Sequence, residues 1–139
     1  MHEWALAEGV ITTALKAAGK EGLARITRIV VALGELQQIE PEIFEYALGE
    51  VMSRLELRLE SVDIVLQKEP ALFRCRVCQH EFSTEETTGG LREEEMEAIH
   101  FIPELAHTYL RCPQCESPDF EVVQGRGVWI HSIEGEERA

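Results

Sequence analysis

Apolar residues recur in the first half of the chain with two different periods. Residues 2–18 return to an apolar position every three or four residues, which predicts a helix with one buried stripe. The same period over 41–58, beginning at a proline, predicts a second helix. Residues 26–33 and 61–67 are rich in β-branched or alternating apolar side chains, which predicts strands. This order predicts an α+β fold in which two helices pack on a small mixed sheet.

The pattern changes after Pro70, where cysteine pairs replace the regular apolar spacing. We expect residues 71–124 to form a small inserted domain with an acidic insertion at about 80–108. Within it, residues 85–97 include six glutamates, a composition typical of a mobile, solvated excursion.

Two further strands are predicted near the end of the chain, at 119–124 and at 128–133. The last strand is expected to return to the first sheet. The first domain would then be discontinuous and consist of residues 1–70 plus 125–139.

Acidic residues outnumber basic residues by 26 to 13, which gives the chain a formal net charge of -13. A surface this negative repels phosphate backbones and anionic lipid, so neither nucleic acid nor a membrane is an expected partner. The sequence has no apolar run of the roughly 20 residues that span a bilayer, and it begins without a secretory signal. We therefore expect a cytoplasmic protein, a monomer or a homodimer, whose four cysteines stay reduced.

The four cysteines form two C-x-x-C knuckles, Cys75–Cys78 and Cys112–Cys115, separated by 33 residues. In each knuckle two sulfurs turn toward one point while nearby backbone amides face them. Together the knuckles supply four thiolates in a tetrahedron, which is the arrangement of a structural zinc site. Because protein ligands fill all four positions, the metal would stabilise a short segment rather than act in hydrolysis.

Two other uses of such knuckles compete with zinc. Rubredoxin binds a redox-active iron with four thiolates, but the glycines that usually follow its knuckles are replaced here by Gln79 and Glu116. A thioredoxin-type redox motif needs only one pair and a βαβ context. The sequence therefore favours zinc, and rubredoxin-like electron transfer stays an alternative.

The N-terminal Met1-His2-Glu3 is a second place for metal chemistry. The free α-amine, the amide nitrogen of His2 and its imidazole can close adjoining chelate rings on one cation, and the Glu3 amide can supply another nitrogen. Nitrogen ligands in a plane favour Ni(II) or Cu(II) over Zn(II). The alternative interpretation is an exposed histidine at a frayed terminus.

Several of these features occur together in one known family. The opening Met-His-Glu, the strand ending Leu33-Gly34-Glu35-Leu36, the two knuckles and Gly125-Arg126-Gly127 before the last strand resemble HypA. HypA is the nickel metallochaperone of [NiFe]-hydrogenase maturation, and the resemblance covers essentially the whole chain. It implies a nickel-binding α+β domain into which a zinc-ribbon domain is inserted.

The resemblance also implies a function and a ligand set. The chain would carry Ni(II) as cargo to the [NiFe]-hydrogenase large-subunit precursor, working with a HypB-type GTPase. His2 would be the nickel ligand, with Met1 and Glu3 contributing backbone nitrogen or, for Glu3, its carboxylate. The zinc ligands would be the knuckle residues Cys75, Cys78, Cys112 and Cys115. Since no catalytic or phosphate-binding motif accompanies them, the chain is not expected to be an enzyme.

The segment between the knuckles is longer than in many HypA proteins and resembles the archaeal form. If its end packs beside the first domain, His100 can complete a square of nitrogens around nickel; the alternative for His100 is a capping or packing role. His107 and His80 are weaker candidates. The alternative function is a zinc-ribbon adaptor that binds other proteins without a metal cargo, for which His2 would not matter.

Overall fold

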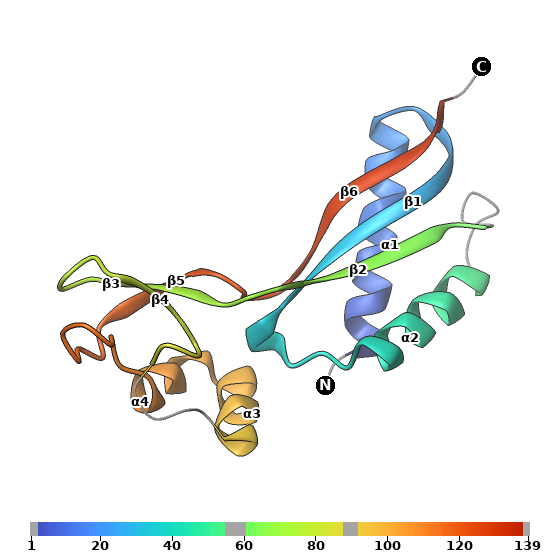
Figure 1. Cartoon of the computed structure of the whole chain (residues 1–139). Helices are drawn as coiled ribbons and strands as arrows, with labels where there is room; N and C mark the ends of the chain where they lie inside the picture. Colours follow the sequence, from blue (N-terminus) through green and yellow to red (C-terminus); the bar gives the residue numbers. More distant parts are fainter. Residues whose placement is uncertain (1–2, 55–60, 88–91, 138–139) are drawn as a thin grey trace. The chain divides into compact units, whose positions relative to one another are not determined.

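A computed structural model describes residues 3–54, 61–87 and 92–137 of the chain (Figure 1). Its internal contacts divide the chain into two compact units. The first unit contains residues 1–33, 39–67 and 128–139, and the second unit contains residues 34–38 and 68–127. None of the helices in the described ranges is long and apolar enough to cross a membrane.

The first unit packs two helices against a three-stranded sheet. Strand β6 returns from the end of the chain to pair with β1 in the antiparallel direction, so that the strand order is β2-β1-β6. Leu33 lies opposite Val128 at one end of this pair. The elements are α1 (Glu3–Lys20), β1 (Leu23–Gly34), α2 (Pro41–Arg54), β2 (Asp63–Glu69) and β6 (Val128–Glu137).

The core of the first unit is mainly aliphatic. The side of α1 with three- and four-residue spacing faces the sheet, and its Ile11 has no exposed surface. From α2, Phe44 and Leu48 are also fully buried, and they meet Ile29 of β1. The helical period of the sequence therefore corresponds to a real buried face.

The second unit is built on a small antiparallel sheet with strand order β4-β3-β5. Three phenylalanines, Phe73, Phe82 and Phe120, come from its three strands, and their ring centroids lie 5.2, 5.4 and 5.6 Å apart. Ile99 and Leu110 from the helical segment complete this core. The elements are η1 (Glu35–Gln37), β3 (Leu72–Cys75), β4 (Glu81–Ser83), α3 (Glu93–Phe101), η3 (Pro103–Leu105), α4 (Ala106–Tyr109) and β5 (Phe120–Gln124).

The main elements predicted from the sequence are confirmed. Helices α1 and α2 correspond to the helices predicted at 2–18 and 41–58, although residues 55–58 lie outside the described residues. The return of the last strand to the first sheet is confirmed by the β1–β6 pairing. The α+β fold class is therefore correct.

The prediction of a mobile, solvated excursion over 85–97 is wrong from Glu93 onward, where α3 begins. The glutamates of its first turn are favoured by the positive end of the helix dipole. The Glu95 carboxylate also accepts a hydrogen bond from the backbone N–H of Arg92 at 3.2 Å. On the other side, Ile99 is buried in the second-unit core. The acidic composition marks the exposed side of a helix here, and residues 88–91 lie outside the described residues.

Residues 34–38, 68–70 and 125–127 belong to the second unit, whereas the sequence predicted them in the first domain. The Glu35 carboxylate accepts hydrogen bonds from Ala71 N–H and from the Thr84 hydroxyl, both at 2.7 Å. A Cβ atom on Gly34 would lie 2.4 Å from the carbonyl oxygen of Gly125. Gly125 has a φ of 96°, and its own Cβ would lie 2.4 Å from the Cα of Ala71. Both glycines are therefore needed for this close approach of three chain segments.

Candidate metal centres

The two knuckles of the second unit have the same backbone geometry. The first lies between β3 and β4, and the second lies between α4 and β5. The backbone N–H of Cys75 donates to the carbonyl of His80 at 2.9 Å, and that of Cys112 donates to Ser117 at 3.0 Å. This repeated hydrogen bond closes each knuckle into a tight turn, so that its two sulfurs face the same point.

A left-handed residue follows each knuckle. Gln79 has a φ of 67° and Glu116 a φ of 63°. These are the two positions after the knuckles at which rubredoxin usually has glycine. The backbone therefore adopts the conformation that glycine favours without having glycine, at a cost of about 1–2 kcal/mol per residue.

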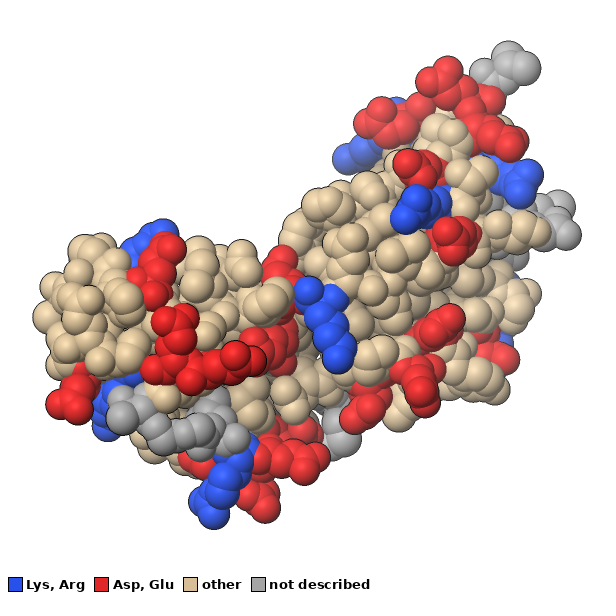
Figure 2. All heavy atoms as spheres, viewed as in Figure 1, with Lys and Arg blue, Asp and Glu red and all other residues tan. Residues whose placement is uncertain are grey.

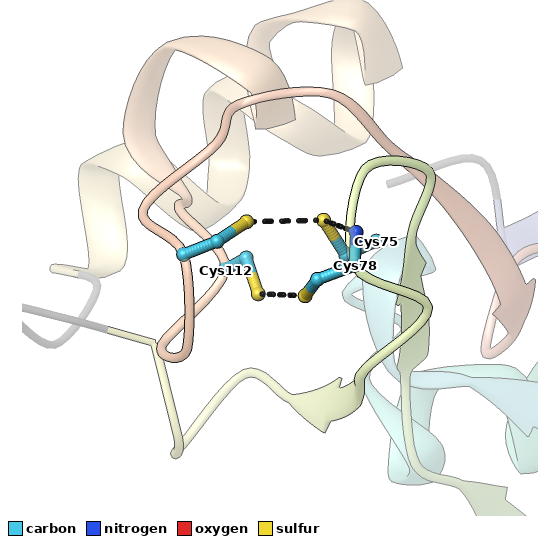
Figure 3. Close-up of side chains that lie close together, drawn as sticks. Cys75, Cys78 and Cys112 are labelled. Carbon is cyan, nitrogen blue, oxygen red and sulfur yellow. Dashed lines mark hydrogen bonds between the residues drawn. The ribbon is translucent and has the colours of Figure 1, made fainter.

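The four sulfurs converge on one centre (Figure 3). The Sγ atoms of Cys75 and Cys115 lie 3.5 Å apart, those of Cys78 and Cys112 lie 3.6 Å apart, and all four lie within 4.8 Å of one another. All four cysteines are free thiols. A tetrahedral zinc ion with Zn–S bonds of about 2.3 Å would set its sulfurs about 3.8 Å apart. The observed spacing fits such an ion.

The surroundings separate the pKa values of the thiols. The backbone N–H groups of Cys78 and Val77 lie 3.5 and 3.4 Å from the Cys75 sulfur, and they lower the pKa of Cys75 to about 7. The N–H of Ser117 favours the Cys115 thiolate, but desolvation and the neighbouring sulfurs outweigh it and raise the pKa of Cys115 to about 12. Since metals bind thiolates, zinc binding here would release protons.

Two histidines near the knuckles have other contacts. His107 lies on α4, where its Nδ1 is 2.7 Å from the carbonyl oxygen of Pro118 and its ring packs on Phe120 with a centroid distance of 4.4 Å. The backbone carbonyl of His80 closes the first knuckle. The four cysteines are the one cluster of at least three potential metal ligands in the described part of the chain.

The second predicted site begins in the first turn of α1. Met1 and His2 lie outside the described residues. Glu3 is 7% exposed. Burial favours its neutral acid, but a backbone hydrogen bond from Glu3 itself, the positive charge of the N-terminus and a backbone hydrogen bond from Glu40 together outweigh burial, so the pKa of Glu3 is lowered. The first turns of α1 and α2 are also joined by Trp4 and Tyr46, whose ring centroids lie 6.0 Å apart.

His100 belongs to the second unit, whereas Glu3 belongs to the first. His100 lies in the last turn of α3, and its ring contacts the ring of Phe101 with a centroid distance of 5.1 Å. Its assignment as a nickel ligand stays a prediction.

Sequence reasoning did not foresee two features around these centres. The first is the use of the Glu35 carboxylate to hold Ala71 and Thr84 in the second unit. The second is the contact between Trp4 and Tyr46, both of which remain largely exposed. Glu35 was visible as part of the Leu-Gly-Glu-Leu motif, but its hydrogen-bond partners are 36 and 49 residues away in sequence.

Known proteins are similar to this chain in sequence and in fold. The family described as "Hydrogenase/urease nickel incorporation, metallochaperone, hypA" matches residues 1–135. Hydrogenase maturation factor HypA of Thermococcus onnurineus is 48% identical over 133 residues, which cover 96% of this chain and 94% of the relative. HypA of Pyrococcus furiosus is 45% identical over 141 residues, which cover 99% of this chain and all (100%) of the relative.

A solved structure agrees at the level of the fold. The solution structure of the Ni metallochaperone HypA from Helicobacter pylori matches with a TM-score of 0.67 and 20% identity, covering 99% of this chain and 100% of that chain. The family match extends from the N-terminal motif through both knuckles to the last strand. The chain belongs to the HypA family of metallochaperones, which act in nickel incorporation during hydrogenase maturation, and it is not an enzyme.

Proposed function

We propose that the chain binds Ni(II) at Met1, His2 and Glu3 and delivers it to the large-subunit precursor of [NiFe]-hydrogenase, together with a HypB-type GTPase. The observation that carries this proposal is the family match over residues 1–135, which includes both the N-terminal motif and the knuckles. Delivery takes place in the cytoplasm, where the cysteines stay reduced.

In this proposal the two metals have different roles. Zinc is resident and would be held by Cys75, Cys78, Cys112 and Cys115, where it supplies a closed tetrahedral link between the knuckles. Nickel is the cargo, and its proposed N-terminal ligands are part of the first unit. The geometry of the sulfurs supports the first role, because four protein ligands leave no position for exchange.

The chemistry of the N-terminal motif suits a cargo site. Its donors are the α-amine, the imidazole of His2 and backbone amide nitrogens, which must lose their protons to bind. Such a site weakens at acid pH, and it lies at the end of the chain, where a partner's ligand can replace one donor at a time. In this proposal His100 adds a further nitrogen to the nickel ligands.

The decisive experiment is a titration of Ni(II) into zinc-loaded, untagged protein that retains Met1. We expect one tight equivalent in the wild type and its loss in His2→Ala, with the circular dichroism spectrum unchanged. His131→Ala is the matched control, because His131 is an exposed histidine of β6 in the same unit. His100→Ala tests the additional ligand and should weaken binding without abolishing it.

The outcome separates the two functions predicted from the sequence. Equal nickel binding by wild type and His2→Ala, or no tight binding by either, would contradict a cargo site at the N-terminus. The zinc-ribbon adaptor would then be the better explanation. Zinc content measured in the same samples should stay at one ion per chain in every histidine variant.

A further inference from the structure

The first unit has an exposed apolar surface where its two helices begin. Trp4 of α1 is 48% exposed, and Ile43 and Tyr46 of α2 are 48% and 63% exposed. We call these three residues the aromatic surface. A contiguous exposed apolar patch on a protein surface often marks a site where another molecule binds.

The three side chains form one continuous patch. The rings of Trp4 and Tyr46 are edge to face, with an interplanar angle of 84°. Ile43 lies one helical turn before Tyr46 and therefore shares its side of α2. On the opposite side of the helix, Phe44 and Leu48 are fully buried, so the aromatic surface is not needed to complete the core.

The rim of the aromatic surface is acidic. Glu8 lies one turn after Trp4, Glu42 and Glu45 flank Ile43 on α2, and all three are exposed. Within the described ranges, no basic side chain forms an ion pair with any of them. The basic residues of the two helices lie toward their far ends, at positions 16, 20 and 54. In Figure 2, acidic side chains accordingly gather over α2.

We propose that the aromatic surface docks the protein that accepts nickel, through an apolar pocket bordered by lysine and arginine side chains. Tryptophan and tyrosine are the residues that most often dominate binding energy at protein interfaces. The acidic rim selects a basic border on the partner and speeds the encounter. A second copy of this chain fits poorly, because it has the same net charge of -13.

This inference rests on the proposed function and specifies the partner's binding surface. Nickel can pass directly between two sites only when ligands of both reach the ion together. Trp4 follows His2 by two residues, which span at most about 7 Å of extended chain. A protein bound to the aromatic surface would therefore hold its own metal ligands within reach of the cargo. The acceptor in the proposed function is the hydrogenase large-subunit precursor.

The test measures binding of the purified precursor to zinc-loaded wild type, Tyr46→Glu and the double variant Glu42→Lys/Glu45→Lys. We expect Tyr46→Glu to weaken binding by about 30-fold or more. The double variant should slow association about tenfold at low salt and reduce its salt dependence. Nickel titrations should be unchanged in both, because neither variant alters the N-terminal motif.

Matched controls lie on β6 of the same unit. Trp129→Glu replaces an aromatic residue that is 44% exposed, and Glu134→Lys/Glu137→Lys makes the same change of charge. Both should bind the precursor within twofold of wild type. Full precursor binding by Tyr46→Glu would overturn the docking surface and leave the proposed function intact.

Three other outcomes are also informative. Loss of GTPase binding alone in Tyr46→Glu would overturn the assignment to the acceptor. Conversion of a dimer to a monomer with unchanged precursor binding would show that a second copy covers the surface, and would overturn the proposal. Wild type that binds nickel but not the precursor would overturn both this inference and the proposed delivery.

Discussion

The two units bury their cores in different ways. The first unit sets two helices with regular apolar faces against β1, and its core is mainly aliphatic apart from Phe44. The second unit has short strands and helices, and it relies on three phenylalanines together with the buried cysteines Cys75 and Cys112. A unit this small builds a marginal core without a metal. The first unit can therefore fold on its secondary structure, whereas we expect the second unit to depend on a metal held by its four cysteines.

Removal of zinc should have the largest effect and should separate the units. With a chelator, or in Cys112→Ser, we expect the second unit to lose its folded structure, because structural zinc contributes on the order of 10 kcal/mol. Amide hydrogen exchange should show lost protection in β3 and β5 and retained protection in α1 and β1. Equal loss in both units would contradict the comparison.

A core substitution in the first unit should have the opposite pattern. Phe44→Ala removes a fully buried ring and should lower the free energy of unfolding of the first unit by about 3–5 kcal/mol. Its zinc content should stay at one ion per chain. Phe101→Ala is the control, since Phe101 is 52% exposed and its loss should change stability by less than about 0.5 kcal/mol.

A substitution at Glu35 tests whether residues 34–38 contribute to the stability of the second unit. Glu35→Ala leaves Ala71 N–H and the Thr84 hydroxyl without their acceptor and should destabilise the second unit by about 1–3 kcal/mol. Exchange of the Ala71 amide should accelerate, while the amides of α1 keep their rates. The exposed Glu42→Ala provides the control. If α1 loses protection instead, Glu35 acts mainly on the first unit.

The smallest effect is expected at the start of α3. The pKa of Glu95 is lowered because its carboxylate accepts the backbone N–H of Arg92 and also pairs with the Arg92 side chain. A lowered pKa in the folded chain gives stability that is complete above the ordinary value of 4.5 and is lost as the pH falls below it. Glu95→Gln should therefore speed amide exchange in α3 by the same factor at pH 6 and at pH 8. A difference that disappears at pH 6 would show that another group controls this cap.

The success of sequence reasoning differs between the units for a physical reason. In the first unit, apolar residues recur every three or four positions over enough residues to define α1 and α2. The same apolar residues are the ones that become buried in the core. In the second unit α3 is short and acidic, and its helical form depends on burial of Ile99 against residues from distant strands. Such a helix has no long apolar stripe of its own, so composition alone favoured a solvated excursion.

The sequence by itself predicted that these four cysteines form one cluster, because two residues between a pair of cysteines form a knuckle wherever that spacing occurs. The family was also determined by sequence, since its motifs recur in a fixed order. Tertiary structure alone decided what Glu35 holds, why Gly34 and Gly125 must lack side chains, and that Trp4 and Tyr46 meet. Each of these depends on segments far apart in the chain, whose approach is set by packing and leaves no local signal in the sequence.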